Sequence, residues 1–165
     1  MTKKHMQLTS IVLFFIIIVG ILLCYNPIVI HNWHFENSAV TKQERFFSNF
    51  NFDQGSWKCY VVIKDKDDIS PLIPNGKVLS TSDISVLKQL QKIHFSYFGN
   101  DLATIESQIY MYKNGELYYC TSIWLGEHRS GLQTNEFGWV GAIEAESFCQ
   151  VFSDFKRVYL PIIIF

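Results

Sequence analysis

The sequence predicts an α+β protein with an N-terminal transmembrane helix, followed by a small, mostly antiparallel sheet with helices packed on one face. Three observations predict this fold: an uncharged apolar run near the N-terminus, alternating apolar and polar segments around an Asn-Gly turn, and apolar residues at helical spacing elsewhere. With 165 residues, 48% of them hydrophobic, the chain is long enough for one compact domain and a short appendage.

The apolar run covers residues 11–23 (IVLFFIIIVGILL), where twelve of the thirteen residues are Ile, Val, Leu or Phe. Together these favour insertion into a bilayer by about 4–7 kcal/mol. Residues 8–25 carry no charge and are just long enough to span about 30 Å of hydrocarbon. Lys3 and Lys4 precede the run, and no Lys or Arg follows until Lys42. By the positive-inside rule we expect a cytoplasmic tail (1–7), an uncleaved signal anchor (8–25) and export of the remainder.

Two other interpretations of this segment stay open. A cleaved signal peptide would share the basic start and the apolar core, but no A-x-A pattern follows. A lipoprotein would need a small residue before Cys24, where the chain has Leu23. A composition rich in Ile, Asn, Lys and Phe suits a bacterial inner-membrane protein, so we expect residues 26–165 to be periplasmic.

The exported part divides into a stalk (26–40) and an α+β domain (41–165). We expect a first helix over 41–51, because Thr41 and Glu44 fit a capping box. The alternating segment 56–65 (SWKCYVVIKD) predicts a strand with one buried face.

The next predicted elements are a loop and a second helix. Residues 65–77 contain two prolines and a PNG turn signal, which predicts a loop. A second helix over about 83–96 has Ser80 or Ser82 as its N-cap and ends at Gly99-Asn100. We expect His94, on the inner face of this helix, to be a core residue.

A hairpin over 108–124 is the clearest element, because both residues of Asn114-Gly115 tolerate the positive φ of a type I′ turn. This turn places Lys113 opposite Glu116, Tyr112 opposite Leu117 and Tyr110 opposite Tyr119. After it we expect a loop (126–136), a strand (137–143), a third helix (144–155) and a last strand (157–165). Pro161 lacks an N–H, which places that last strand at a sheet edge.

Three cysteines (Cys59, Cys120 and Cys149) lie in the exported domain, where oxidation occurs. We expect a disulfide between Cys120 and Cys149, because the third helix is expected to cover the hairpin. The alternative is three buried thiols.

The sequence shows no site for a metal, a cofactor or a catalytic reaction. His31-x-x-His34 lacks further ligands, Asp65, Asp67 and Asp68 lack the EF-hand pattern, and no G-x-S-x-G surrounds Ser130 beside His128. A net charge of −1 argues against nucleic acid as a partner. We therefore expect neither an enzyme nor a small-molecule substrate, cofactor or metal.

Aromatic residues of the hairpin are the candidate binding residues. Exposed Tyr and Trp dominate protein–protein hot spots, so we expect Tyr110, Tyr112, Tyr118 and Trp124 to contact a partner. The alternative is that helices cover them.

In layout the chain resembles the small accessory proteins of bacterial membrane-bound transcription activators, of the ToxS, TcpH and PsaF kind. Lys3-Lys4, the apolar segment 8–25 and the cysteine-containing exported remainder are the matching features. The resemblance implies a domain that binds and stabilises or regulates the periplasmic part of an activator of adhesin or pilus genes, hence a role in virulence. The alternatives are a membrane-anchored immunity protein that neutralises a periplasmic toxin, and a structural subunit of an envelope complex.

Overall fold

The structure, a computed structural model, describes residues 3–31, 42–64, 68–99 and 105–165, with the backbone alone for residues 3–9. Most of the predicted stalk, the start of the predicted first helix at Thr41, His34 of the histidine pair, and Asp65 and Asp67 lie outside the described residues.

Two compact units make up the chain. The first comprises Met1–Trp33 together with Val158–Phe165, and the second comprises His34–Arg157. The last eight residues, which the sequence placed in the domain, therefore belong with the N-terminal segment. The first unit contains α1 (Lys3–Tyr25), β1 (Ile28–Ile30) and β10 (Ile162–Ile164).

Helix α1 is apolar from Ile11 to Leu23, with Gly20 the one exception. Its described side chains are open to the surroundings, with Ile11 65% and Leu22 62% exposed. Among the described residues, no helix meets both the length and the apolarity that crossing a membrane requires.

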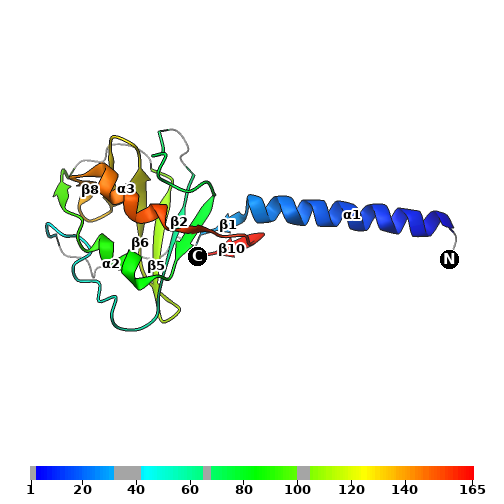
Figure 1. The fold of residues 1–165 in the computed structure, drawn as a ribbon, viewed down its shortest axis with the longest axis horizontal. Coiled ribbons are helices and arrows are strands. Elements are labelled where there is room, and N and C mark those ends of the chain that lie inside the picture. The colour runs from blue at the N-terminus through cyan, green and yellow to red at the C-terminus, as the bar shows by residue number, and fades with distance from the viewer. Residues whose placement is uncertain (1–2, 32–41, 65–67, 100–104) are drawn as a thin grey trace. The chain divides into compact units, whose positions relative to one another are not determined.

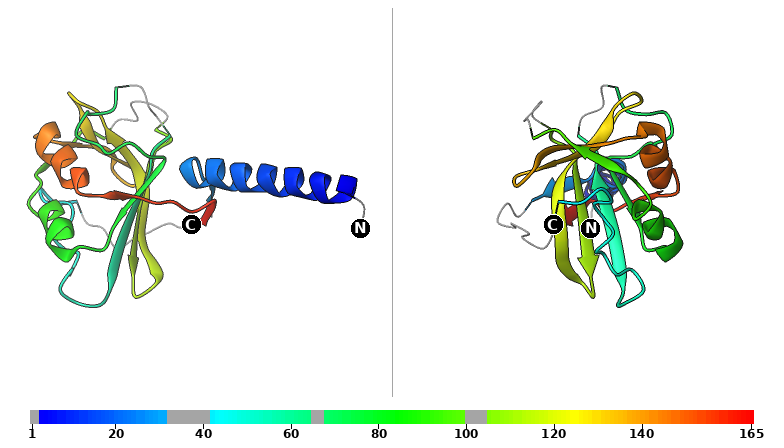
Figure 2. Two further views of the ribbon diagram at one scale, coloured as in Figure 1. Left: turned by 45° about the vertical axis from the view of Figure 1, so that its right-hand side comes forward. Right: turned by 90° about the vertical axis from the view of Figure 1, so that its left-hand side faces the viewer.

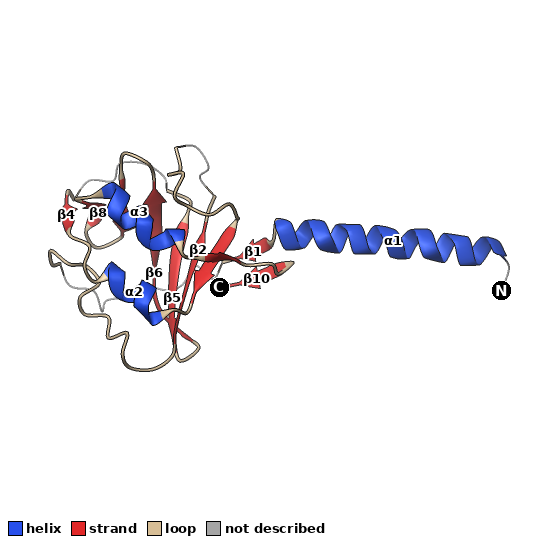
Figure 3. Cartoon of the chain, viewed as in Figure 1, coloured by secondary structure: helices blue, strands red, loops and turns tan. Residues whose placement is uncertain are grey.

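The second unit confirms the α+β class with a mostly antiparallel sheet. Eight strands are hydrogen-bonded in the order β4-β8-β7-β6-β5-β2-β3-β9, and each neighbouring pair is antiparallel. Figures 1 and 3 show how these strands and the helices of this unit are arranged. In chain order the elements are β2 (Trp57–Val62), β3 (Val78–Thr81), α2 (Ile84–Leu90), β4 (Phe95–Tyr97), β5 (Gln108–Lys113), β6 (Glu116–Leu125), β7 (Ser130–Thr134), β8 (Gly138–Ala142), α3 (Ala145–Ser153) and β9 (Lys156–Arg157).

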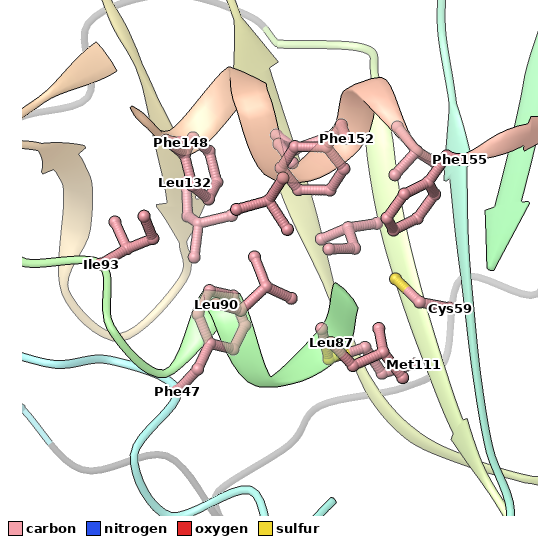
Figure 4. Packing of buried hydrophobic residues seen from close by; sticks show 14 of the residues in the cluster. Phe47, Cys59, Leu87, Leu90, Ile93, Met111, Leu132, Phe148, Phe152 and Phe155 are labelled. Atoms are coloured by element: carbon pink, nitrogen blue, oxygen red, sulfur yellow. The ribbon is translucent and has the colours of Figure 1, made fainter. Parts of the chain in front are cut away.

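Helices α2 and α3 lie on the same side of this sheet, as predicted (Figure 2). Phe148 and Phe152 of α3 and Leu90 of α2 meet residues of the sheet in one apolar cluster (Figure 4). Each of these three side chains is completely buried. The third helix predicted over 144–155 is thus confirmed as α3 (Ala145–Ser153).

The predicted first helix over 41–51 is wrong, because its described part forms turns. The amides of Ser48 and Phe50 donate to carbonyls three residues earlier, at Arg45 and Phe47. Burial explains the irregular path. Phe46, Phe47, Phe50 and Phe52 are all at most 2% exposed, and one regular helix does not aim four rings at this spacing into a single core.

The second helix is shorter than predicted and is capped by another residue. Asp83, not Ser80 or Ser82, is the N-cap, and its carboxylate accepts a hydrogen bond from the Ser85 amide at 2.8 Å. The helix ends at Leu90, and Phe95–Tyr97 form β4 because they pair with β8.

β7 was predicted as loop, and the last strand was predicted wrongly. β3 lies between the predicted loop and the predicted second helix, where no element was expected. Residues 157–165 do not form one edge strand. Arg157 ends β9 at the edge of the large sheet, whereas Ile162–Ile164 pair with β1.

Candidate functional site

Strands β5 and β6 form a hairpin, and the turn that joins them is the one that the sequence predicted. Asn114 and Gly115 have φ angles of 55° and 85°. The Asn114 amide donates to the Ser56 carbonyl at 2.8 Å, and its side-chain oxygen accepts from the Ser56 amide at 2.9 Å. These bonds tie the turn to the start of β2. The predicted pairs Lys113–Glu116 and Tyr112–Leu117 are confirmed.

Beyond the turn a β-bulge shifts the register, so the predicted Tyr110–Tyr119 pair is wrong. Tyr119 lies opposite Met111, and Tyr110 lies opposite Cys120. Tyr118 is the extra residue of β6.

Packing of the two adjacent tyrosines explains the bulge. The Tyr118 ring centroid lies 4.9 Å from that of Trp57 and 5.4 Å from that of Phe50. The Tyr119 ring also packs against Phe50, at 5.5 Å. In a regular strand, successive side chains point to opposite faces. The bulge allows both rings to reach the same aromatic cluster.

The hairpin therefore presents two different faces. The core face, which packs against the helices, carries the completely buried Ile109, Met111 and Ile123. The opposite face carries the side chains that we call the tyrosine face: Tyr60, Tyr110, Tyr112, Cys120 and Trp124. Their shared side follows from the register, in which Tyr60 pairs with Tyr110 and Tyr110 pairs with Cys120, and from strand alternation.

Within the tyrosine face, depth varies from residue to residue. Tyr110 is only 2% exposed and donates its hydroxyl hydrogen to the Gln108 side chain. Tyr60, Tyr112 and Trp124 are half-buried. The rings of Tyr60 and Tyr112 meet edge to face at 6.0 Å. This arrangement combines large apolar rings with polar hydroxyl groups, which is the chemistry of a protein contact surface.

The side chain of Lys58 borders the tyrosine face. The Lys58 ammonium lies 4.9 Å from the Tyr60 ring centroid. Lys58 faces Tyr112 across the β2–β5 pair, so the cation and the two rings form one continuous group.

The structure does not bring the four predicted binding residues onto one face. Tyr110, Tyr112 and Trp124 belong to the tyrosine face, whereas Tyr118 packs with Trp57 on the other side of the sheet. Tyr60 was missed as a binding residue, although strand alternation in 56–65 places its side chain on the other face of the strand from Trp57 and Cys59. Its pairing with Tyr110 depends on which strand lies beside β2, and no local pattern indicates that choice.

All four cysteines are free thiols, so the predicted Cys120–Cys149 disulfide is not formed. Cys120 lies on the tyrosine face, whereas Cys149 projects from α3 into the core, so the sheet separates them. The Cys149 sulfur instead lies 3.1 Å from the Ser130 hydroxyl oxygen.

Burial also controls the protonation of these thiols. It raises the pKa of Cys120 to about 12, although a hydrogen bond with Tyr110 acts in the opposite direction. The pKa of Cys149 is likewise raised by burial, as is that of Cys59. All three groups are therefore protonated near neutral pH, and a protonated thiol is a poor nucleophile.

The histidine predicted to lie in the core has a different environment. His94 follows α2, and its side chain is 40% exposed. Its Nδ1 lies 2.6 Å from the Glu44 carboxylate, and its Nε2 accepts a hydrogen bond from Arg45 at 3.2 Å. The ring thus joins the turn segment to the start of β4 at the surface.

Polar side chains outside the tyrosine face are the remaining candidates for binding chemistry. Within the described parts of the chain, no three or more His, Cys, Asp or Glu side chains gather as metal ligands would. The Ser130 hydroxyl is buried and donates to the Gly126 carbonyl at 2.7 Å, which is a structural contact. An open hollow of about 560 Å³ lies beside the turn between β7 and β8, with Lys42 and Glu136 in its lining.

The chain was also compared with known proteins. No family model, no curated protein and no solved structure matches it.

Proposed function

We propose that this protein is a single-pass inner-membrane accessory protein whose periplasmic domain binds another envelope protein through the tyrosine face. A membrane-bound transcription activator of adhesin or pilus genes is the partner that the layout of the chain favours. The observation that carries the proposal is the separation of the hairpin into a buried core face and a tyrosine face on which Tyr112 and Trp124 are half-buried.

The character of the tyrosine face supports a protein partner. Tyr112, Tyr60 and Trp124 each present a large ring that is neither fully buried nor fully exposed. A partner that covers such rings gains apolar contact at a low cost in side-chain entropy. The strands hold the rings in place, since β5 pairs with β2 on one side and β6 on the other.

The membrane anchor is the second part of the proposal. It is supported by the uncharged segment 8–25, by the lysines before it, and by the exposed apolar side chains of α1. Residues 1–7 would then be cytoplasmic and the second unit periplasmic.

A membrane pull-down with single variants tests the binding role. Tyr112→Ala and Trp124→Ala in the full-length protein should reduce recovery of the partner, identified by mass spectrometry, at least about tenfold. Phe98→Ala is the matched control, because Phe98 is an aromatic residue of the same unit and is 59% exposed. Its partner recovery should equal that of the wild type.

The identity of the captured protein separates the classes of function. Capture of a transcription activator with its own membrane span supports the proposal, and capture of a toxin would instead show an immunity protein. Equal recovery by all three variants at unchanged melting temperatures would refute the tyrosine face as the binding surface.

A further inference from the structure

The C-terminal segment of the chain forms a small β-ribbon with the residues that follow α1. β1 and β10 are parallel, with Ile28 opposite Ile162 and Ile30 opposite Ile164. The Ile28 amide donates to the Pro161 carbonyl and the Phe165 amide to the Ile30 carbonyl, both at 3.0 Å. Figure 1 shows the two strands side by side.

One face of this ribbon consists of isoleucine alone. Because side chains alternate along a strand, the two directly opposed pairs share one face. Their four side chains are Ile28, Ile30, Ile162 and Ile164, exposed by 48%, 49%, 52% and 71%. Ile163, on the other face, is only 7% exposed. The ribbon thus has a covered face and an open face that is completely apolar.

We propose that the isoleucine face lies in the lipid interface of the membrane, so that the C-terminus of the protein is held at the bilayer. This inference rests on the proposed anchoring of residues 8–25. It extends that proposal to a second membrane contact, made by Ile28 and Ile30 just after the anchor and by Ile162 and Ile164, which lie more than 130 positions further along the sequence.

The short connection between α1 and β1 supports lipid as the partner that covers the isoleucine face. The Asn26 amide still donates to the Leu22 carbonyl at 2.9 Å, so helical bonding continues to the point where the ribbon begins. Only Asn26 and Pro27 lie between Tyr25 and Ile28, and three steps along the backbone limit the distance between these two Cα atoms to about 11 Å. The headgroup layers add roughly 5–8 Å on each side of the hydrocarbon. The ribbon therefore begins within or next to the headgroup layer.

The absence of charged residues near the ribbon and the position of two tyrosines also support lipid as the partner of the isoleucine face. Neither residues 26–30 nor residues 158–164 contain a charged side chain. The Tyr25 and Tyr159 rings meet edge to face at 5.6 Å, with exposed fractions of 54% and 56%. Tyrosine is enriched at the level of the headgroups, where its ring contacts lipid and its hydroxyl contacts water.

Carbene photolabelling of the full-length protein tests this placement. The protein is reconstituted into vesicles of phosphatidylethanolamine and phosphatidylglycerol that contain a phospholipid with a diazirine high in its acyl chain, and adducts are located by mass spectrometry. Adducts on residues 28–30 and 160–164 should be at least about tenfold more abundant than adducts at Ile143 and Phe98. These two controls are exposed apolar residues of the second unit.

A substitution pair makes the test specific. Ile164→Lys should reduce labelling of the ribbon several-fold and leave labelling of α1 unchanged, since the side chain is mostly exposed and its loss leaves the fold intact. Ile143→Lys is the matched control and should change neither signal.

The outcomes separate this inference from the function on which it rests. If α1 is labelled but the ribbon is labelled no more than Ile143, the inference is overturned and the proposed anchor stands. Absence of label from both α1 and the ribbon overturns the anchor as well. Cross-linking of the ribbon to a second copy or to another protein, in place of lipid, also overturns the inference.

Discussion

The two faces of the β5–β6 hairpin come from one alternating sequence, yet they have different surroundings. On the core face, Met111 and Tyr119 are at most 3% exposed and lie within the cluster that α2 and α3 cover. On the tyrosine face, Tyr112 and Trp124 remain half-buried. Since both faces carry large apolar side chains, hydrophobicity does not distinguish them. The difference is set by what packs on each face, and helices α2 and α3 pack on the core face.

The largest expected effect is on the stability of the core face. Phe152→Ala removes a completely buried ring that packs at about 5 Å against both Phe148 and Phe155. It should lower the free energy of unfolding by about 3–5 kcal/mol, measured by chemical denaturation. Tyr112→Ala on the tyrosine face should cost less than about 1 kcal/mol. Similar losses for the two variants would mean that the faces are equally buried.

Tyr118 sharpens the comparison, because it is a hairpin tyrosine that lies outside the tyrosine face. Tyr118→Ala removes edge-to-face contacts with Trp57 and Phe50, each worth about 0.5–1.5 kcal/mol. We expect a loss of about 1–2 kcal/mol in unfolding free energy and no loss of partner recovery. Loss of the partner at unchanged stability would place Tyr118 in the interface.

Alkaline pH should destabilise the fold through the buried thiols. Burial raises the pKa of Cys120 from 9.0 to about 12, so between these values the unfolded chain has lost a proton that the folded chain retains. The contribution of the buried Cys120 thiol to the free energy of unfolding is complete below about pH 9 and disappears as pH rises toward 12. Cys120→Ser, which does not titrate in this range, should lose less stability between about pH 9 and 11 in thermal melts.

Alkylation of the unreduced, denatured protein tests whether Cys120 and Cys149 are separate thiols. The two faces place Cys120 and Cys149 on opposite sides of the sheet, so all four thiols should react. An intact Cys120–Cys149 bridge in the mass spectrum would contradict this assignment of the faces.

The smallest expected effect concerns the cap of a helix on the core face. Hydrogen bonds from the Ser85 hydroxyl and amide lower the pKa of Asp83 below 3.8. The stabilising effect of the charged cap is present above the unfolded pKa and is lost as pH falls through the folded value. Asp83→Asn should therefore show a weaker decrease in melting temperature than the wild type on acidification from about pH 5 to 3.

Local chemistry determined which elements were predicted correctly. The Asn114-Gly115 turn follows from the backbone freedom of two adjacent residues, and α3 follows from phenylalanines at helical spacing. Both signals act within a few residues. The sequence alone therefore predicted the β5–β6 hairpin, helix α3 and the α+β class.

Elements that depend on distant partners were missed. β7 has the sequence SGLQT, with little β propensity, and is a strand because it lies between β6 and β8. A side chain at Gly131 would place its first carbon 2.3 Å from the Val140 carbonyl oxygen, so this glycine permits the close pairing. The capping pattern at Thr41 and Glu44 failed to predict structure because burial of four phenylalanines outweighs local propensity.

The candidate site was predicted only in part for the same reason. Three of the four aromatic residues chosen from the sequence share a face. The bulge places Tyr118 elsewhere, because two successive rings reach Phe50. Tyr60 joins the face only through pairing of β2 with β5. A register shift of this kind depends on tertiary packing, which alternation along one strand does not encode.

Hydroxyl-radical footprinting tests the central claim, that the tyrosine face contacts a partner, most directly. Oxidation rates of Tyr112 and Trp124 are compared between the purified full-length protein and the protein in its native membranes. We predict rates at least about threefold lower in membranes for both residues, with the rate of Phe98 unchanged, because an interface excludes water from its hot spots. Equal rates for Tyr112 and Trp124 in the two preparations would contradict the account.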